Sequence, residues 1–472
     1  MAFLEVLKNI LDTLGSVVIV PVMIFIIALF MRVPVKKAFI SGLSIGIGLE
    51  GFNLLIGSFS GVIAPVVQRM VDVSGINLPI FDIGWQAGAM IAYSTNIGLL
   101  FMGLCIALQL LMFATKFTNV FQATDLWNNY SYMIYGSMCY LVTKNFWLSF
   151  GCMLVLLLFT TVCAEFISRR FANYYGYEGC TVSMLHIAGD APYAFFMNWL
   201  LNKFGLYKIK ADPTTLKKRL GFIGDPMVLG AIVGLILGIS GNFDRMLTLE
   251  GLGSILTCTI ATSAVMTIFP KIASIFAGAF TSITSAARKN AKGKDMIISV
   301  NDATVYGETA GLTTGLICMP IILLLAFILP GNKVLPVLNL VAIPYGMLTF
   351  ISMSNGNIVK SVISALGKLI LTLYISTLIA PMFTQIALSV GIEIAAGLTL
   401  VTAWGSVDHP IGIAVMYAFI SGNPLIIGGV IVADILFYVL FKKNKNKILD
   451  FVEKEAYRGM EDVTDNVSVD AA

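Results

Sequence analysis

Two short stretches, "HIAGDAP" and "VDHP", contain the only two histidines of the chain, His186 and His409. Each histidine lies close to an aspartate of an Asp-x-Pro triplet, Asp190 in the first stretch and Asp408 in the second. An imidazole changes its charge near neutral pH, so a histidine beside a carboxylate is suited to relaying protons or to binding a polar ligand. A simpler alternative stays open, in which both histidines only hydrogen-bond neighbouring helices or lie among lipid headgroups.

The composition around these motifs is that of a membrane protein. Of 472 residues, 58% are hydrophobic and 12% are charged, whereas about a quarter of the residues of a soluble domain are charged. Apolar runs of eighteen or more residues recur, as at 14–31 and 148–167, without the alternation typical of barrel strands. We therefore predict an all-α integral membrane protein. Its seven scattered cysteines are expected to pack between helices and not to bind metal.

Basic residues indicate the orientation in the membrane. The positive-inside rule assigns all five basic clusters to the cytoplasm, with the N-terminus outside and the C-terminus inside; the clusters are 32–37, 169–170, 203–219, 288–294 and 442–458. We expect about eleven transmembrane helices, including one between 384 and 441; the others lie near 14–31, 38–67, 86–115, 126–143, 146–170, 225–242, 250–280, 312–330, 336–354 and 358–381.

Both Asp-x-Pro motifs fall in segments that fit this topology only as re-entrant pieces. The segment 180–202 has basic clusters on both sides, so it enters and leaves by the same face. A second re-entrant piece around 404–420 satisfies the odd number of crossings before the basic residues at 442–447. Such broken backbone is tolerated at membrane depth only where it is buried or lines a cavity.

The two halves of the chain resemble each other in order. "GWQAG" matches "GETAG", "TDLWNNY" precedes an apolar span as "LNLVAIPY" does, and "KNFWLS" pairs with "GNIVKS", roughly 210 to 225 residues apart. Corresponding spans run in opposite directions, which predicts an inverted-topology repeat with substrate bound near the midplane. We divide the chain into a first repeat (1–170), a re-entrant segment with a basic linker (171–222), a second repeat (223–441) and a cytoplasmic tail (442–472).

Nine acidic residues lie within or beside apolar stretches, namely Glu50, Asp82, Asp125, Glu165, Asp190, Asp302, Glu308, Asp408 and Asp434. A charge facing lipid at mid-bilayer costs about 2.5–3.5 kcal/mol, so those at depth should line a cavity, pair or be protonated. Three of them have a simpler alternative: Asp82 and Asp125 can lie at a membrane interface, and Glu165 can pair with Arg169 one turn away.

The repeat motifs contain the polar residues that we expect to bind substrate. Carboxylates, amides and an indole face suit a polyhydroxylated ligand, which needs directional hydrogen bonds and an apolar plate. The alternative for Trp85 and Trp127 is anchoring at the membrane interface. The candidate substrate-binding residues are Trp85, Gln86, Asn128, Asn129, His186, Asp190, Asp302, Glu308, Thr309, Asp408 and His409. The sequence shows no set of metal ligands and no nucleophile–base pair, and we expect no cofactor.

Several longer motifs are specific enough to suggest a family. The chain resembles the membrane (IIC) component of galactitol-type phosphotransferase systems (PTS), in the ascorbate–galactitol superfamily, over roughly residues 1–445. The resemblance implies a homodimer with V-motif and core domains built from inverted repeats, in which the core carries the sugar between faces. The motifs are "DIGWQAGAMIAYSTNIGLL", "ATDLWNNYSY", "KKRLGFIGDPMVLGAIVGLILGI", "VNDATVYGETAG" and "ILPGNKVLPVLNL", of which "GDPMVLG" and "LPGNKVLP" are the most specific.

The resemblance also implies vectorial chemistry. A polyol or sugar enters from outside, and a separate IIB protein phosphorylates it from a phosphocysteine, which receives its phosphate indirectly from IIA. No catalytic phosphorylation site is therefore expected in this chain, and none of its cysteines takes the IIB role. The basic stretch 203–219 and the tail either dock IIB or are ordinary cytoplasmic loops.

Two departures and one alternative remain. Family members often have proline in place of Gln86 and His-Pro in place of Glu308 and Thr309, so the substrate can differ from galactitol. The competing function is an ion-coupled secondary transporter of a small polar solute, with His186–Asp190 and Asp408–His409 as proton relays. A membrane-embedded enzyme or receptor is a third, weaker reading.

Overall fold

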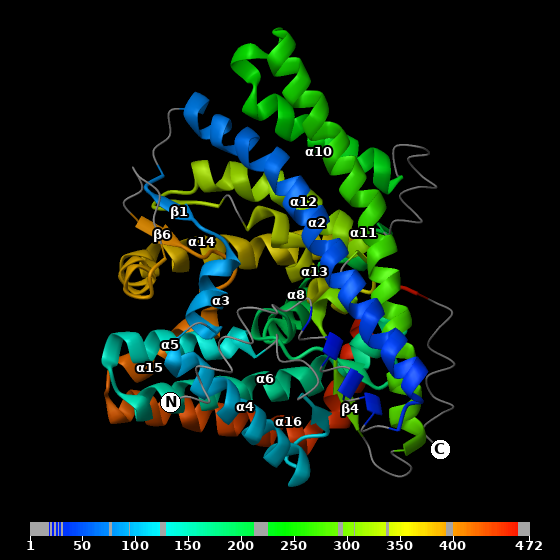
Figure 1. Ribbon diagram of the computed structural model, residues 1–472, viewed down its shortest axis with the longest axis vertical. Coiled ribbons are helices and arrows are strands. Elements are labelled where there is room, and N and C mark those ends of the chain that lie inside the picture. The colour runs from blue at the N-terminus through cyan, green and yellow to red at the C-terminus, as the bar shows by residue number, and fades with distance from the viewer. Residues whose placement is uncertain are drawn as a thin grey trace.

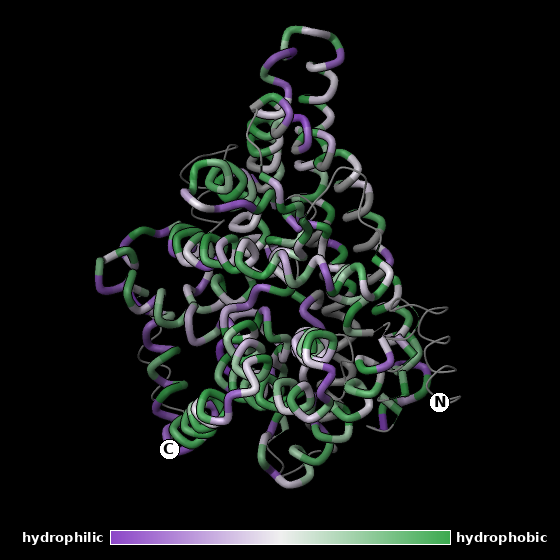
Figure 2. The backbone as a smooth tube through the Cα atoms, turned by 90° about the vertical axis from the view of Figure 1, so that its left-hand side faces the viewer, coloured by the Kyte–Doolittle hydropathy of each residue, from purple (hydrophilic) through white to green (hydrophobic). Residues whose placement is uncertain are grey.

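The computed structural model is mostly helical (Figure 1). It describes residues 18, 21–22, 25–26, 28–29, 32–74, 78–93, 95–122, 129–211, 225–290, 296–305, 307–336, 339–392 and 400–460. Figure 2 shows hydrophobic stretches along most helices, with hydrophilic residues at turns and in short stretches in the middle of the molecule. Polar groups inside a largely apolar bundle are costly to bury unless they pair or line a cavity.

Three helices form a layer along one side of the molecule (Figure 1): α2 (Val35–Ser74), α10 (Pro226–Gly241) and α11 (Leu249–Asn290). A Cβ atom at Gly241 would lie 2.4 Å from the carbonyl oxygen of Val66, and one at Gly51 would lie 3.6 Å from Ile272. Helices α2 and α11 are therefore antiparallel, so the start of α2 and the end of α11 lie at the same end of the layer. We call these three helices the outer layer.

The remaining helices form a second body. Several begin at a side chain that accepts hydrogen bonds from free N–H groups of the first turn, such as Asn145 before α6 and Asn357 before α14. The helices are α3 (Trp85–Tyr93), α4 (Asn96–Ala114), α5 (Tyr130–Thr143), α6 (Phe146–Tyr175), α7 (Leu185–Ala188), α8 (Ala191–Lys203), α12 (Thr309–Ile328), α13 (Ile343–Met353), α14 (Ile358–Ser389), α15 (Pro410–Ile420) and α16 (Pro424–Ala456). The 3-10 turns within the described residues are η1 (Leu206–Lys208), η3 (Phe243–Arg245) between α10 and α11, η4 (Asp302–Thr304) and η5 (Leu340–Ala342).

The expectation of an all-α fold was wrong in one respect, because two small parallel sheets link the broken segments. One has the order β5-β1-β6 and the other β2-β4-β3. In each sheet the central strand comes from one half of the chain and both outer strands come from the other half. The strands are β1 (Ile80–Asp82), β2 (Val120–Phe121), β3 (Cys180–Thr181), β4 (Ile297–Ser299), β5 (Val334–Leu335) and β6 (Leu400–Thr402).

Six helices in the described ranges are long and apolar enough to cross a membrane: α4, α6, the first part of α11, α12, α14 and α16. Several of the spans that we expected are shorter or divided. The expected span 86–115 is split between α3 and α4, and only 343–353 is helical within 336–354. Both re-entrant candidates contain a strand followed by short helices, β3–α7–α8 and β6–α15.

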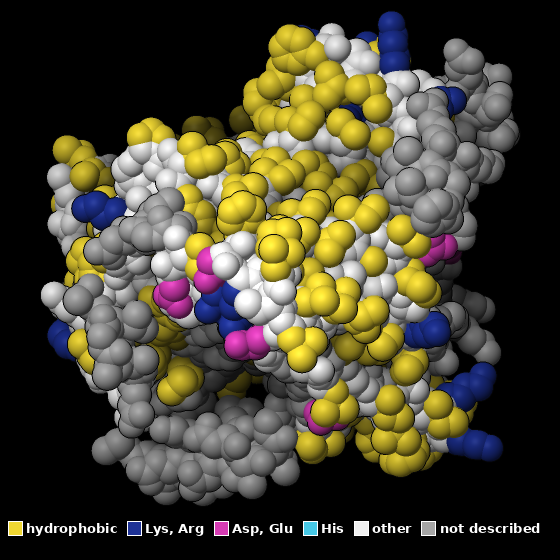
Figure 3. All heavy atoms as spheres, turned by 90° about the horizontal axis from the view of Figure 1, so that it is seen from above, with side chains coloured by type: hydrophobic (Ala, Val, Ile, Leu, Met, Phe, Trp, Pro, Cys, Tyr) yellow, Lys and Arg dark blue, Asp and Glu magenta, His cyan; other side chains and the backbone are white. Residues whose placement is uncertain are grey.

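Exposure distinguishes peripheral from central helices. In the most apolar part of α16 only 11% of the residues are buried, against 72% in α6. Figure 3 shows a face covered largely by hydrophobic side chains, with few charges. A face of this kind is suited to contact with lipid, because apolar side chains gain nothing from water.

Candidate functional site

The two Asp-x-Pro motifs, about two hundred residues apart in sequence, meet in the middle of the second body. The His186 ring lies 6.2 Å from the His409 ring, measured between centroids, and its Nε2 contacts the carbonyl oxygen of Ser406. A Cβ atom at Gly189 would lie 2.3 Å from the carbonyl oxygen of Leu185 and 3.1 Å from His409 Nε2. Only glycine permits this approach. We call His186, Asp190, Lys368, Asp408 and His409 the paired centre.

Asp190 is the link between the two motifs. It is 4% exposed, its Oδ2 contacts Lys368 Nζ, and its Oδ1 lies 3.3 Å from His409 Nε2. His409 Nδ1 accepts a hydrogen bond from the Gly412 N–H at 3.4 Å, which places the ring proton of a neutral imidazole on Nε2, facing Asp190. Lys368, Asp190 and His409 thus form a continuous row of polar groups, in which Asp190 and His409 are buried and Lys368 is partly buried.

Asp408 has different partners. Its Oδ2 accepts hydrogen bonds from the Gly405 N–H and from Ser376 Oγ, both at 2.8 Å. The within-motif pairs that a proton relay would use, His186–Asp190 and Asp408–His409, are therefore replaced by a contact across the motifs, Asp190 to His409. This difference corrects the relay that the sequence suggested.

Lys368 is the member of the paired centre that the sequence analysis missed. It lies on α14, and its ammonium group also donates to the carbonyl oxygen of His186 at 3.3 Å. The sequence did contain a signal for this residue, because Lys368 is a single cation inside the long apolar run 361–380. The rule that draws attention to intramembrane carboxylates applies equally to an intramembrane lysine.

A second buried carboxylate, Asp82, joins three chain segments and has a structural role. It is fully buried within the protein, and its depth in the membrane stays a prediction. Its oxygens accept from the backbone N–H groups of Gly84, Asn339 and Trp404 at 3.0, 2.8 and 3.1 Å. Trp85 opens α3, and its backbone N–H donates to Asn339 Oδ1 at 2.9 Å.

Glu308 lies beside a small open hollow and begins helix α12. Its carboxylate accepts from the backbone N–H groups of Ala310 and Gly311 at 3.0 and 2.7 Å and from the Tyr174 hydroxyl at 3.1 Å. Thr309, the first residue of α12, is partly exposed beside it. The hollow has room for about one water molecule, so a polyol enters only if the surrounding helices move. Its lining is Tyr175, Asp302, Val305, Gly307, Glu308, Gly311, Leu312, Pro344, Tyr345 and Leu348.

The hollow and the paired centre are neighbours through Tyr130. The ring of Tyr130 stacks near His186, with 6.0 Å between centroids and an angle of 18° between planes. Asp302 is close enough to Tyr130 to interact with it electrostatically. Among the described residues here, the buried polar atoms without a hydrogen-bond partner include His186 Nδ1 and Thr304 Oγ1. Buried polar atoms usually find a partner, so these are positions where a polar ligand or water fits.

The other candidates have mixed outcomes. Asn129 is buried and accepts a hydrogen bond from Gln109 at 2.8 Å, a contact between α4 and the start of α5. Gln86 lies in α3, but its side chain is outside the described part of the chain, and Asn128 lies outside the described residues altogether. No group of three or more His, Cys, Asp or Glu residues suited to a metal ion occurs within the described ranges.

Glu165 does not pair with Arg169, contrary to the alternative considered for it. Its carboxylate contacts Lys442 at 2.6 Å and Lys445 at 2.9 Å and accepts from Thr118 Oγ1 at 2.6 Å. Arg169 instead contacts Asp450. Both contacts involve α16, so residues 442–460 pack on the protein; the rest of the predicted tail lies outside the described residues.

Comparison with known proteins identifies close sequence relationships. The family model described as "PTS system sugar-specific permease component" matches residues 9–397. The "Putative permease IIC component" of Escherichia coli (strain K12) is 28% identical over 443 residues, which cover 92% of this chain and 98% of that protein. The "PTS system galactitol-specific EIIC component" of the same strain is 27% identical over 401 residues, covering 84% and 87%.

Proposed function

The chain belongs to the family of PTS sugar-specific permease components, and from this premise we propose that it carries a galactitol-like polyol or sugar into the cell for phosphorylation by a separate IIB protein. Membership in this family and several apolar helices make it a multi-pass protein of the bacterial inner membrane that works with IIA and IIB partners. The galactitol-specific relative supports a polyol as the substrate.

The observation that carries the proposal is the meeting of the two Asp-x-Pro motifs. A carboxylate, an ammonium group and two imidazoles are buried together in an apolar bundle. Keeping them there is costly unless they pair or serve a ligand. A polyol offers hydroxyl groups that both donate and accept hydrogen bonds, so it can satisfy the polar atoms that neighbouring side chains leave open. We propose that substrate binds between the paired centre and the Glu308 hollow.

We also propose that the molecule is built from two inverted repeats. Exchanging the two halves converts the sheet order β5-β1-β6 into β2-β4-β3, with corresponding strands roughly 210 to 225 residues apart. Helices α2 and α11 are antiparallel, and the end of α6 lies beside the start of α14, where Tyr174 contacts Gly356. These relations support an inverted repeat, with the outer layer as the V-motif and the second body as the core.

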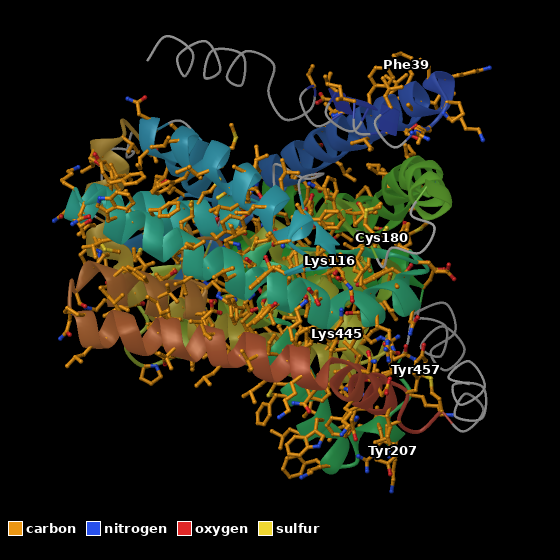
Figure 4. The ribbon with its side chains drawn as sticks, turned by 90° about the horizontal axis from the view of Figure 1, so that it is seen from below. Phe39, Lys116, Cys180, Tyr207, Lys445 and Tyr457 are labelled. Carbon is orange, nitrogen blue, oxygen red and sulfur yellow. The ribbon has the colours of Figure 1, made fainter. Side chains whose placement is uncertain are left out.

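Orientation and assembly follow from the same proposal. Three basic clusters, at 169–170, 203–210 and 442–458, lie at one end of the second body, which we assign to the cytoplasm. In Figure 4, Phe39 near the start of α2 and Tyr457 after α16 lie toward the same end of the molecule. The N-terminus is then outside and the C-terminus inside, and the family resemblance supports a homodimer.

The experiment that tests this function is phosphoenolpyruvate-dependent uptake in membranes supplied with the partner proteins, across hexitols, pentitols and hexoses. We expect uptake and phosphorylation of a polyol, with both lost when IIB is omitted. Uptake that continues without IIB and follows a proton or sodium gradient would establish the ion-coupled alternative. Asp302→Ala and Glu308→Ala should each abolish uptake while membrane insertion is unchanged, and normal transport by both variants would remove the hollow from the substrate path.

A further inference from the structure

The last turns of α16 form, with three other helix ends, a platform at one end of the second body. Its elements are the end of α6, the end of α8 with η1, the start of α14 and residues 445–460. We call this the C-terminal platform. Figure 4 shows Lys445 and Tyr457 along α16, with Tyr207 on the neighbouring η1 turn.

Buried ionic and polar contacts attach this platform to the rest of the protein. Arg170 of α6 is fully buried, and its guanidinium donates to Glu453 Oε2 at 2.6 Å and to Asn355 Oδ1 at 2.9 Å. Asn202 of α8 donates to Glu455 Oε2 at 2.9 Å. Removing one partner of such a buried pair leaves an uncompensated buried charge, so the contact is costly to break. The end of α16 therefore moves with the second body as one unit.

The length of α16 places the platform in water. Residues 424–441 extend about 27 Å at 1.5 Å per residue, which nearly equals the hydrocarbon thickness of about 30 Å. Helix α16 is kinked at Asn444, and Phe451 lies ten residues beyond that segment, which is about 15 Å of chain along the two parts of the helix. The headgroup layer is only about 5–8 Å thick on each side, so Phe451 and the residues after it project past the lipid.

The outward side of the platform is basic and carries exposed apolar side chains. On α16, Lys447, Phe451 and Lys454 recur at a helical spacing of three or four residues and are all exposed. Phe204, at the end of α8, is 72% exposed. The exposed acid of this part of α16, Asp450, contacts Arg169. A cluster of apolar side chains with a charged rim, facing water, is typical of a protein-binding surface.

We propose that the C-terminal platform is the docking surface for an acidic face of the IIB protein. This inference rests on the proposed function, because it assumes that IIB delivers the phosphate. The position is suitable: Tyr174, four residues after Arg170 on α6, donates to Glu308 at the edge of the hollow. A protein docked on the platform would thus stand beside the cytoplasmic mouth of the substrate path, where the phosphoryl group must meet the sugar.

The test measures the affinity of a purified galactitol-type IIB protein for the full chain in nanodiscs of neutral phosphatidylcholine. The variant Lys447→Glu/Lys454→Glu should weaken binding about tenfold or more and reduce its salt dependence, because reversed charges repel an acidic face. Phe451→Ala should weaken binding by increasing the dissociation rate. The matched control for each single change, Lys447→Glu and Lys454→Glu, is Lys144→Glu in the exposed turn before α6, at the opposite end of that helix.

The outcomes separate this inference from the proposed function. Sugar binding to the chain without IIB is measured in parallel and should be unchanged in every variant, which also shows that the variants fold. Wild-type affinity for IIB in the double variant would overturn the docking surface while leaving the function intact. Unchanged affinity for IIB together with less anionic phosphatidylglycerol retained on the double variant during purification in detergent, before reconstitution, would also overturn it, because the platform would then contact lipid.

Discussion

The two Asp-x-Pro motifs are alike in sequence and unlike in their contacts. Asp190 precedes α8 and pairs with Lys368 and His409, whereas Asp408 precedes α15 and accepts hydrogen bonds from Gly405 and Ser376. One carboxylate therefore balances a buried cation, and the other organises a backbone turn. The same motif interrupts the helical chain in both places. The neighbouring helices differ, however, so each aspartate has different partners and a different electrostatic role.

The largest expected effect comes from removing Asp190. Asp190→Ala leaves the partly buried Lys368 without its anion, which should lower the free energy of unfolding by about 3 kcal/mol and abolish uptake. Thermal unfolding in detergent and sugar uptake measure the two effects. Adding Lys368→Met should restore part of the stability, because no uncompensated charge remains. If the double variant is no more stable than the single one, Asp190 does not balance Lys368.

Gly189→Ala should have the next largest effect. The new methyl group would overlap the carbonyl oxygen of Leu185 and crowd His409, at a cost of about 1–3 kcal/mol in the free energy of unfolding. The control is Gly346→Ala on α13, where a Cβ atom meets nothing within 4 Å. Unfolding temperatures that are equal in the two variants would show that the motifs do not approach so closely.

Two substitutions of His409 separate its two roles. His409→Asn keeps an acceptor near the Nδ1 position that caps Gly412 but cannot reach Asp190, so uptake should fall while stability is nearly kept. His409→Gln reaches toward Asp190 but loses the cap, and should lose about 0.5–2 kcal/mol of stability. The comparison uses uptake rates and unfolding temperatures. Identical behaviour of the two variants would mean that one contact alone accounts for His409.

Asp408→Asn should have the smallest effect. The amide oxygen still accepts from Gly405 and Ser376, so the change exchanges two charge-assisted hydrogen bonds for neutral ones at a cost of about 1 kcal/mol. Uptake should stay within about twofold of the wild type, measured beside Asp190→Asn. A loss of uptake as large as that of Asp190→Asn would contradict the division of roles between the two motifs.

Much of the secondary structure followed from local patterns. Apolar runs predicted spans close to α2, α6, α10 and α14, within three residues at five of the eight ends. The sequence did not predict the six short strands, because two or three residues give no periodic signal. It also gave no sign that Glu453 and Glu455 are buried, since their partners Arg170 and Asn202 lie more than 250 residues away in the sequence.

The candidate site divides in the same way. The sequence by itself determined that the protein lies in the membrane, that the chain breaks at His186 and His409, and that polar groups accumulate there, because composition and proline positions are local properties. Only the tertiary structure decided that Asp190 faces Lys368 and His409. It also decided that the Asp82 carboxylate accepts hydrogen bonds from backbone N–H groups instead of binding a ligand. Partners of a buried charge come from distant segments, and their identity depends on how the helices pack.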